Sequence, residues 1–172
     1  MTDRKQNEAD CAEIGELADA HKLLAPFAGT FAAEVRLWMG PGDPIVSTGV
    51  MTNTLDLGGR FLRQHYEGDP GAGPSSEFQG RGYWGYNTVS NQYEGFWIDT
   101  ASTVMQTDTG NVDAAGKVWT MIGQTTCPRT GKPMKKRSTI TLEDRNHHRM
   151  EMYFAYPDGD ESKAMEIRYT RT

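Results

Sequence analysis

The chain has 172 residues, a formal net charge of −5 and two cysteines, and its sequence pI is about 5.4. An acidic protein repels a phosphate backbone on average, so this composition argues against nucleic-acid binding. Two cysteines are too few for a disulfide framework, and the length is that of one domain. We therefore expect a single domain that folds in a reducing compartment.

The N-terminal residues are polar and acidic, and they contain no apolar run of the length that a signal peptide or a membrane span requires. We expect a flexible tail over residues 1–12 and one domain over residues 13–172, in a cytoplasmic protein with no membrane partner. The one basic run is Lys135-Lys136-Arg137. We interpret it as a solvated strand end rather than a nucleic-acid patch.

One short helix is predicted before the first strand. From Asp10, a candidate N-cap, apolar residues recur at helical spacing as far as Ala25, and Pro26 ends the pattern. His21 lies on this apolar stripe. We interpret it as a partly buried histidine paired with a backbone group, not as a ligand-binding residue.

After Gly29 the apolar period changes to two, which is typical of strands. Short turns rich in Gly, Pro, Asn and Asp interrupt it, as in Gly40-Pro41-Gly42-Asp43-Pro44. We count roughly ten strands by these signals. They cover residues 30–39, 45–57, 60–68, 80–86, 93–100, 102–109, 117–126, 135–142, 149–156 and 163–171.

Consecutive strands with short connections usually pair with each other, and a meander of this length must close or cover its edges. We therefore predict an all-β fold, a single antiparallel up-and-down barrel of roughly ten strands with one short N-terminal helix. A two-sheet sandwich is the alternative. The dense glycines at 80, 82, 85 and 95 suit a strongly curved sheet, or large rings lying across bare backbone.

Four blocks of the chain read HKLLAPFAGTF, GGRFLRQHYEG, GRGYWGYNTVSNQYEGFWIDT and MEIRYTR. They resemble the bacterial family known as domain of unknown function 1579, a lipocalin-like (calycin-type) β-barrel family, over about residues 20–171. The resemblance implies the fold, while the activity of that family is not defined. Lipocalins carry Gly-X-Trp on the first strand under an arginine of the last strand. The resemblance implies that Phe31 takes the place of the tryptophan, with Arg168 or Arg171 as the cation.

A barrel of this size has room for a small ligand. One face of the predicted strands offers rings with a few polar tips, which is the usual wall of a ligand pocket. These candidate ligand-binding residues are Gln64, Tyr66, Trp84, Tyr86, Trp97 and Asp99. They could equally form an internally satisfied polar network. The opposite strand parity would instead turn Arg63, His65, Tyr83, Phe96 and Ile98 toward the lumen.

Acid or base catalysis has two candidates, Asp99 and His65, with Glu67 as a further acid and Arg63 as an electrostatic partner. No nucleophile elbow or phosphate-binding loop accompanies them. His147 and His148 are adjacent, so their side chains point to opposite faces of a strand and cannot readily share one ion. We therefore predict no metal site and interpret the two histidines as part of a solvated turn. No cofactor is expected, and haem bound through His65 is the alternative.

The leading functional hypothesis is a non-enzymatic intracellular barrel that binds a small apolar or aromatic molecule in its lumen, with no nucleic-acid partner. Homo-oligomer formation stays open. The alternatives are a small-barrel enzyme that uses Asp99 or His65 as acid or base, and a solid barrel that acts as an interaction module.

Overall fold

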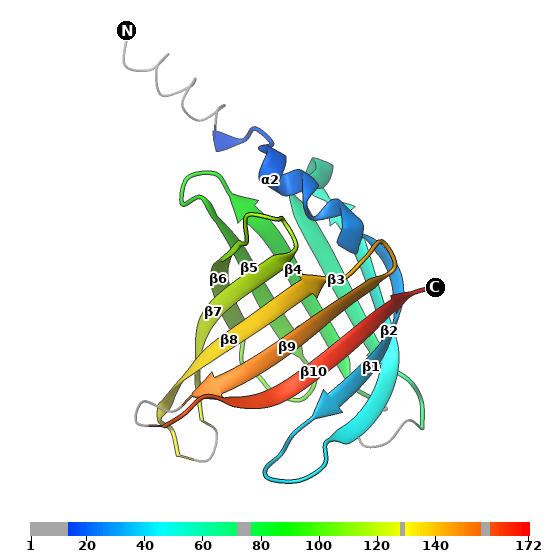
Figure 1. The fold of residues 1–172 in the computed structure, drawn as a ribbon, viewed down its shortest axis with the longest axis vertical. Coiled ribbons are helices and arrows are strands. Elements are labelled where there is room, and N and C mark those ends of the chain that lie inside the picture. Colours follow the sequence, from blue (N-terminus) through cyan, green and yellow to red (C-terminus); the bar gives the residue numbers. More distant parts are fainter. Residues whose placement is uncertain (1–13, 72–76, 128–129, 156–158) are drawn as a thin grey trace, which may run out of the picture.

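The computed structural model describes residues 14–71, 77–127, 130–155 and 159–172. In this part of the chain, ten antiparallel strands form a closed barrel, in which each strand pairs with its neighbours in sequence and β1 also pairs with β10 (Figure 1). The predicted up-and-down barrel is confirmed, and the alternative sandwich is wrong. The strands are β1 (Gly29–Leu37), β2 (Ile45–Asp56), β3 (Phe61–Gly68), β4 (Gln79–Asn87), β5 (Gln92–Asp99), β6 (Gln106–Val112), β7 (Val118–Thr126), β8 (Pro133–Leu142), β9 (His147–Ala155) and β10 (Ser162–Arg171).

The sixth strand begins four residues later than the sequence pattern indicates, at Gln106 rather than at residue 102. Local side-chain bonds hold the preceding connection out of the ladder. A carboxylate oxygen of Asp99 accepts the Ala101 N–H at 3.0 Å, and the Ser102 hydroxyl oxygen accepts the Val104 N–H at 3.3 Å. Such bonds offer the backbone an alternative to strand pairing.

The predicted N-terminal helix is shorter than its pattern. It comprises α2 (Asp19–Lys22) and the 3₁₀ turn η1 (Ala25–Phe27), which contains Pro26. The predicted tail and the candidate N-cap Asp10 lie outside the described residues, whereas Ile14 and Leu17, the first apolar residues of the stripe, are exposed. His21 is buried, and its Nδ1 accepts the N–H of Ala18 at 3.0 Å. This pairing confirms the interpretation of His21 as a buried histidine bonded to the backbone.

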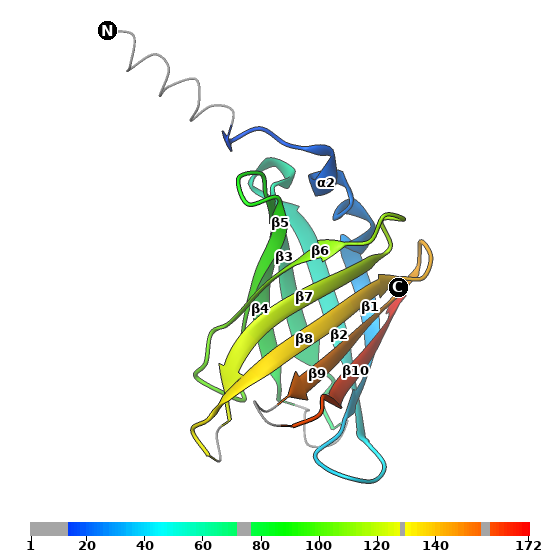
Figure 2. The ribbon, with the colours of Figure 1, turned by 60° about the vertical axis from the view of Figure 1, so that its left-hand side comes forward.

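The helix and η1 close one end of the barrel, as Figures 1 and 2 show from two directions. Leu24 and Phe27 enter the barrel and form a core cluster with Trp84, Tyr93 and Trp119, among others. The hydroxyl of Tyr93 donates to the backbone oxygen of Ala20 at 2.8 Å. Hydrophobic burial and this partly buried hydrogen bond together hold the helix as a plug over the barrel end.

Arg171 fastens the same end from the last strand. Its guanidinium lies 4.4 Å from the centre of the Phe31 ring, and it donates to the backbone oxygens of Pro26 at 2.7 Å and Ala28 at 2.8 Å. Gly29 leaves space for it, because a Cβ there would lie 2.1 Å from the Arg171 Nη1. The expected cation over Phe31 is therefore Arg171, while Arg168 pairs with Glu166.

Several glycines face inward and carry large rings. A Cβ at Gly80 would lie 2.0 Å from the Trp97 ring, and a Cβ at Gly49 would lie 2.3 Å from the Tyr66 hydroxyl. These rings therefore lie across bare backbone, as the glycine density indicated.

In the residues that the structure describes, no helix is long and apolar enough to cross a membrane.

Gly110 allows the closest approach, because a Cβ there would lie 1.9 Å from the backbone oxygen of Thr120. Backbone cannot rotate away as a side chain can, so we expect Gly110→Ala to lower the free energy of unfolding by about 1–3 kcal/mol. Urea denaturation measures this change. Gly40→Ala is the control, because a Cβ at Gly40 would meet no atom within 4 Å. Equal stabilities of the two variants would contradict the steric argument.

Candidate ligand-binding lumen

A cavity of about 740 Å³ occupies the barrel beyond the plug. Its volume falls in the range of small-molecule sites, roughly 300–1,000 Å³. Its walls are mainly rings and flexible thioethers. Five methionines line it, namely Met51, Met121, Met150, Met152 and Met165. At the end away from the plug, the lining reaches Glu77 and Thr100, next to the connections between strands.

Five of the six candidate ligand-binding residues line this cavity, namely Gln64, Tyr66, Trp84, Trp97 and Asp99. Tyr86 points inward as well but lies under the plug, where its ring meets those of His21 at 5.7 Å and Tyr93 at 5.1 Å. The choice of strand parity therefore agrees with the structure. A ligand-binding role for these residues stays a prediction.

The opposite parity is not adopted. Arg63 is exposed and donates to Thr54, and Ile98 is 40% exposed. Tyr83 and Phe96 reach the edge of the cavity, but their rings stack on each other with centres 5.8 Å apart. The Tyr83 hydroxyl donates to the partly exposed Asp56 at 2.9 Å, so this stacked pair belongs to the outer wall.

His65 is on the outer face, where its Nε2 lies 3.1 Å from a carboxylate oxygen of Glu67 and its side chain is 43% exposed. A haem in the lumen therefore cannot use His65 as its axial ligand. The same placement separates the two acid–base candidates, because Asp99 lines the lumen and His65 does not. Asp99 accepts the indole N–H of Trp97 at 3.1 Å, which orients that ring.

The interpretation of the basic run as a solvated strand end is wrong at Lys136. Lys135 is exposed, but the Lys136 side chain is only 5% exposed and lines the cavity. Its Nζ lies 2.9 Å from a carboxylate oxygen of Asp108 and 3.4 Å from the amide oxygen of Gln106. Gly123 lies between Lys136 and Asp108 in the strand register, and its missing side chain lets the two charges meet across β7.

His148 lies at the inner end of the lumen, which sequence reasoning missed. Its ring stacks on that of Tyr169 with centres 4.3 Å apart and meets the rings of Phe27 and Phe31 edge-on. Burial, together with the positive charge of Arg171, lowers the pKa of His148 to about 3. The imidazole is therefore neutral near pH 7. Burial also raises the pKa of Tyr169.

The two adjacent histidines point to opposite faces, as predicted. His147 is exposed and contacts the carboxylate of Asp144 at 2.9 Å, whereas His148 is buried. Placing both in a solvated turn is therefore wrong for His148. Among the described residues, no group of three or more His, Cys, Asp or Glu side chains could hold a metal ion.

Three residues of the cavity wall keep a buried polar atom without a protein hydrogen-bond partner in the part of the chain that the structure describes. These atoms are the Asn53 Oδ1, the Tyr66 hydroxyl oxygen and the Trp84 Nε1. An unsatisfied buried group costs about 1–3 kcal/mol, so the lumen is not a fully satisfied polar network. The pair of Trp97 and Asp99 is satisfied internally.

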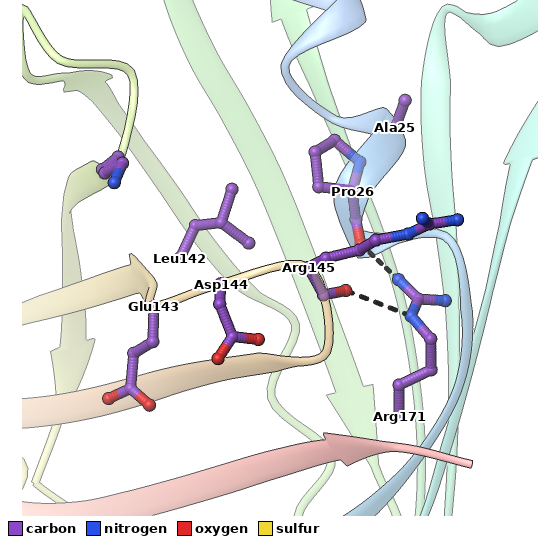
Figure 3. A pocket seen from close by; sticks show the side chains of 8 residues that line it. Ala25, Pro26, Leu142, Glu143, Asp144, Arg145 and Arg171 are labelled. Atoms are coloured by element: carbon purple, nitrogen blue, oxygen red, sulfur yellow. Dashed lines mark hydrogen bonds between the residues drawn. The ribbon is translucent and has the colours of Figure 1, made fainter.

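A second hollow of about 610 Å³ lies outside the barrel at the plugged end (Figure 3). Two of its charged side chains, Arg171 and Asp144, already have protein partners. Arg171 donates to the backbone oxygens of Pro26 and Arg145, drawn as dashed lines in Figure 3, and Asp144 accepts two backbone N–H groups. We therefore take the lumen as the candidate site.

The closed barrel, the plug and the arginine over the Phe31 ring define a lipocalin-like barrel. The chain belongs to the family described as protein of unknown function DUF1579, whose model matches residues 16–171. This membership confirms the resemblance seen in the sequence blocks. A search of curated proteins gives no match.

Solved structures share the fold, among them the following two. Rv2717c from M. tuberculosis is 15% identical with a TM-score of 0.64, over 91% of this chain and 99% of its own. The S-type phycobiliprotein lyase CPES from Guillardia theta is 9% identical with a TM-score of 0.57, over 94% of this chain and 96% of its own. At these identities the likeness concerns the fold alone.

Proposed function

We propose that this protein binds a small, largely apolar or aromatic molecule in its lumen. The observation that carries the proposal is a cavity of about 740 Å³ lined by rings and methionines. A solid interaction barrel would leave no such space. Methionine side chains are flexible and polarisable, so they adapt to an irregular apolar ligand.

The wall is held in place before any ligand arrives. Trp97 lies on Gly80 and Gly82, and Asp99 fixes its indole nitrogen. Tyr66 lies over Gly49 in the same manner. A ring that is already ordered loses little conformational entropy on binding, which favours affinity.

Catalysis by His65 receives less support, because its side chain is on the outer face of the barrel, whereas Asp99 lines the lumen and remains the acid or base candidate. The fold also occurs in a protein titled as a phycobiliprotein lyase. That likeness supports a barrel with a functional lumen and does not name the ligand. From the small number of cysteines we expect the protein to act in the cytoplasm, and from its net charge of −5 we expect no nucleic-acid partner.

The test is fluorescence titration with N-phenyl-1-naphthylamine, a neutral aromatic probe. We expect Trp97→Ala to weaken binding about tenfold or more, which corresponds to losing contacts worth about 1.4 kcal/mol. Ile98→Ala is the matched control, because Ile98 is the next residue on β5, is 40% exposed and does not line the cavity. Equal affinities of the two variants would place the probe outside the lumen.

A further inference from the structure

The lumen contains a charged pair that its apolar walls do not require. The side chains of Lys136 and Asp108 are 5% and 17% exposed, and their charged atoms lie 2.9 Å apart. Replacing a buried ion pair with apolar residues of similar size is often neutral or stabilising. Stability alone therefore does not explain a lysine that lines the cavity, and a role toward the luminal ligand is the better explanation.

Lys136 has donor capacity left for such a ligand. A lysine ammonium group carries three N–H donors. Its two contacts within the described residues are the carboxylate of Asp108 and the amide oxygen of Gln106, both on β6. One N–H is therefore available to an acceptor atom that enters the cavity.

The charge balance of the lumen decides which acceptor fits. Asp108 already balances Lys136, Asp99 forms no ion pair within the described chain, and the low pKa of His148 keeps that ring neutral. An anionic group would add a buried charge without a counter-ion, which is costly. A neutral carbonyl-type oxygen accepts the free N–H and leaves the balance unchanged.

We propose that Lys136 binds a neutral carbonyl oxygen on the luminal ligand, with Asp108 as the counter-ion that selects against anions. This inference rests on the proposed function and names the ligand class, which is an apolar or aromatic molecule carrying a ketone, aldehyde, ester or amide. The lysine is then a specificity residue, while the rings and methionines supply most of the contact area.

Three naphthalene probes separate the contributions of apolar contact, of a carbonyl hydrogen bond to Lys136 and of ligand charge. N-phenyl-1-naphthylamine has no oxygen, 6-propionyl-2-(dimethylamino)naphthalene carries a neutral carbonyl, and 8-anilinonaphthalene-1-sulfonate carries an anion. The variant Lys136→Met/Asp108→Asn removes both charges, and Lys135→Met is the exposed control. We expect the double variant to bind the carbonyl probe about tenfold more weakly than wild type, as for a lost hydrogen bond to a charged group. Its affinity for the naphthylamine should not change.

Asp108→Asn alone gives the opposite readout, because it leaves the charge of Lys136 unbalanced. We expect this variant to bind the sulfonate probe about tenfold more tightly than wild type does, since a charge-assisted contact replaces a repulsion. The double variant, which lacks the lysine charge, should not show this gain.

The outcomes distinguish the two proposals. If none of the probes binds wild type, the proposed function fails. If the naphthylamine binds the lumen but the carbonyl probe binds wild type and the double variant equally, the role of Lys136 is wrong and the proposed function stands. A wild type that prefers the sulfonate to the carbonyl probe would also overturn the inference, since the lumen would then select anions.

Discussion

Between pH 6.5 and pH 5, wild type is expected to lose about 2 kcal/mol of its free energy of unfolding through His148 alone. Burial, helped by the charge of Arg171, lowers the pKa of His148 to about 3 in the folded protein, against an ordinary value of 6.5. Well above pH 6.5 the His148 imidazole is neutral in both the folded and the unfolded protein, so it gives the free energy of unfolding no pH dependence there. As the pH falls below 6.5, the His148 imidazole binds a proton in the unfolded chain but not in the folded protein. The loss grows by about 1.4 kcal/mol per pH unit and levels off near pH 3.

The measurement is urea denaturation at a series of pH values. His148→Phe keeps a ring between Phe27, Phe31 and Tyr169 but cannot titrate, so its stability should stay flat over the same window. His65→Gln is the control, because His65 is on the outer face, and it should follow wild type. Parallel curves for wild type and His148→Phe would show that the buried imidazole accepts a proton without cost.

The titration of acidic groups contributes little to the change in the free energy of unfolding between pH 6.5 and pH 5. Hydrogen bonds from the backbone of Lys117 and Val118 lower the pKa of Asp113, for example. Such a group contributes stability above its unfolded pKa, and that stability is lost only as the pH falls through the lower folded value. The carboxylates therefore act mainly below about pH 4.5.

Lys136→Met is expected to lower the free energy of unfolding by about 3–5 kcal/mol, because it leaves the carboxylate of Asp108 in the lumen without its cation. Asp108 is 17% exposed, so we expect the lower end of this range. Lys136→Met/Asp108→Asn should recover most of the loss, since no unpaired charge remains. Lys135→Met, at an exposed site, should be close to neutral.

Thermal and urea denaturation of wild type, both single variants and the double variant give the coupling between the two residues directly. A single Lys136→Met variant as stable as the double variant would mean that the two charges do not interact in the folded protein. The pair would then be two separately solvated groups, and the argument from luminal charge balance would also fail.

Much of this architecture can be predicted from the sequence, because strand signals are local. Period-two alternation and turn chemistry located the ten strands, and the rings of Trp84 and Trp97 indicated the inner face of β4 and β5. The alternation of inward and outward side chains depends only on neighbouring residues, so it is the same whether or not the sheet closes into a barrel. The start of β6 differed because the side chains of Asp99 and Ser102 bond to backbone nearby.

The missed residues depend on contacts far apart in sequence. Lys136 was predicted to be a surface residue because both its neighbours are basic. In a strand, however, the middle one of three consecutive side chains faces the side of the sheet opposite to the other two. Its partner Asp108 lies 28 positions earlier, and Gly123 between them supplies the space. Tyr86 was placed in the ligand site because nothing in its own strand shows that the N-terminal plug covers it.

The barrel can close only late in synthesis, because closure requires its last strand. Strand β10 is the last of the ten to be made, and its Arg171 bonds to Pro26, 145 residues earlier. A nascent chain that ends at β9 has no enclosed lumen, and β1 and β9 both present unpaired edges to other chains. Such long-range closure is slow and leaves these edges open to aggregation while it proceeds. The barrel can therefore enclose a molecule only after β10 has been translated and has paired with β1.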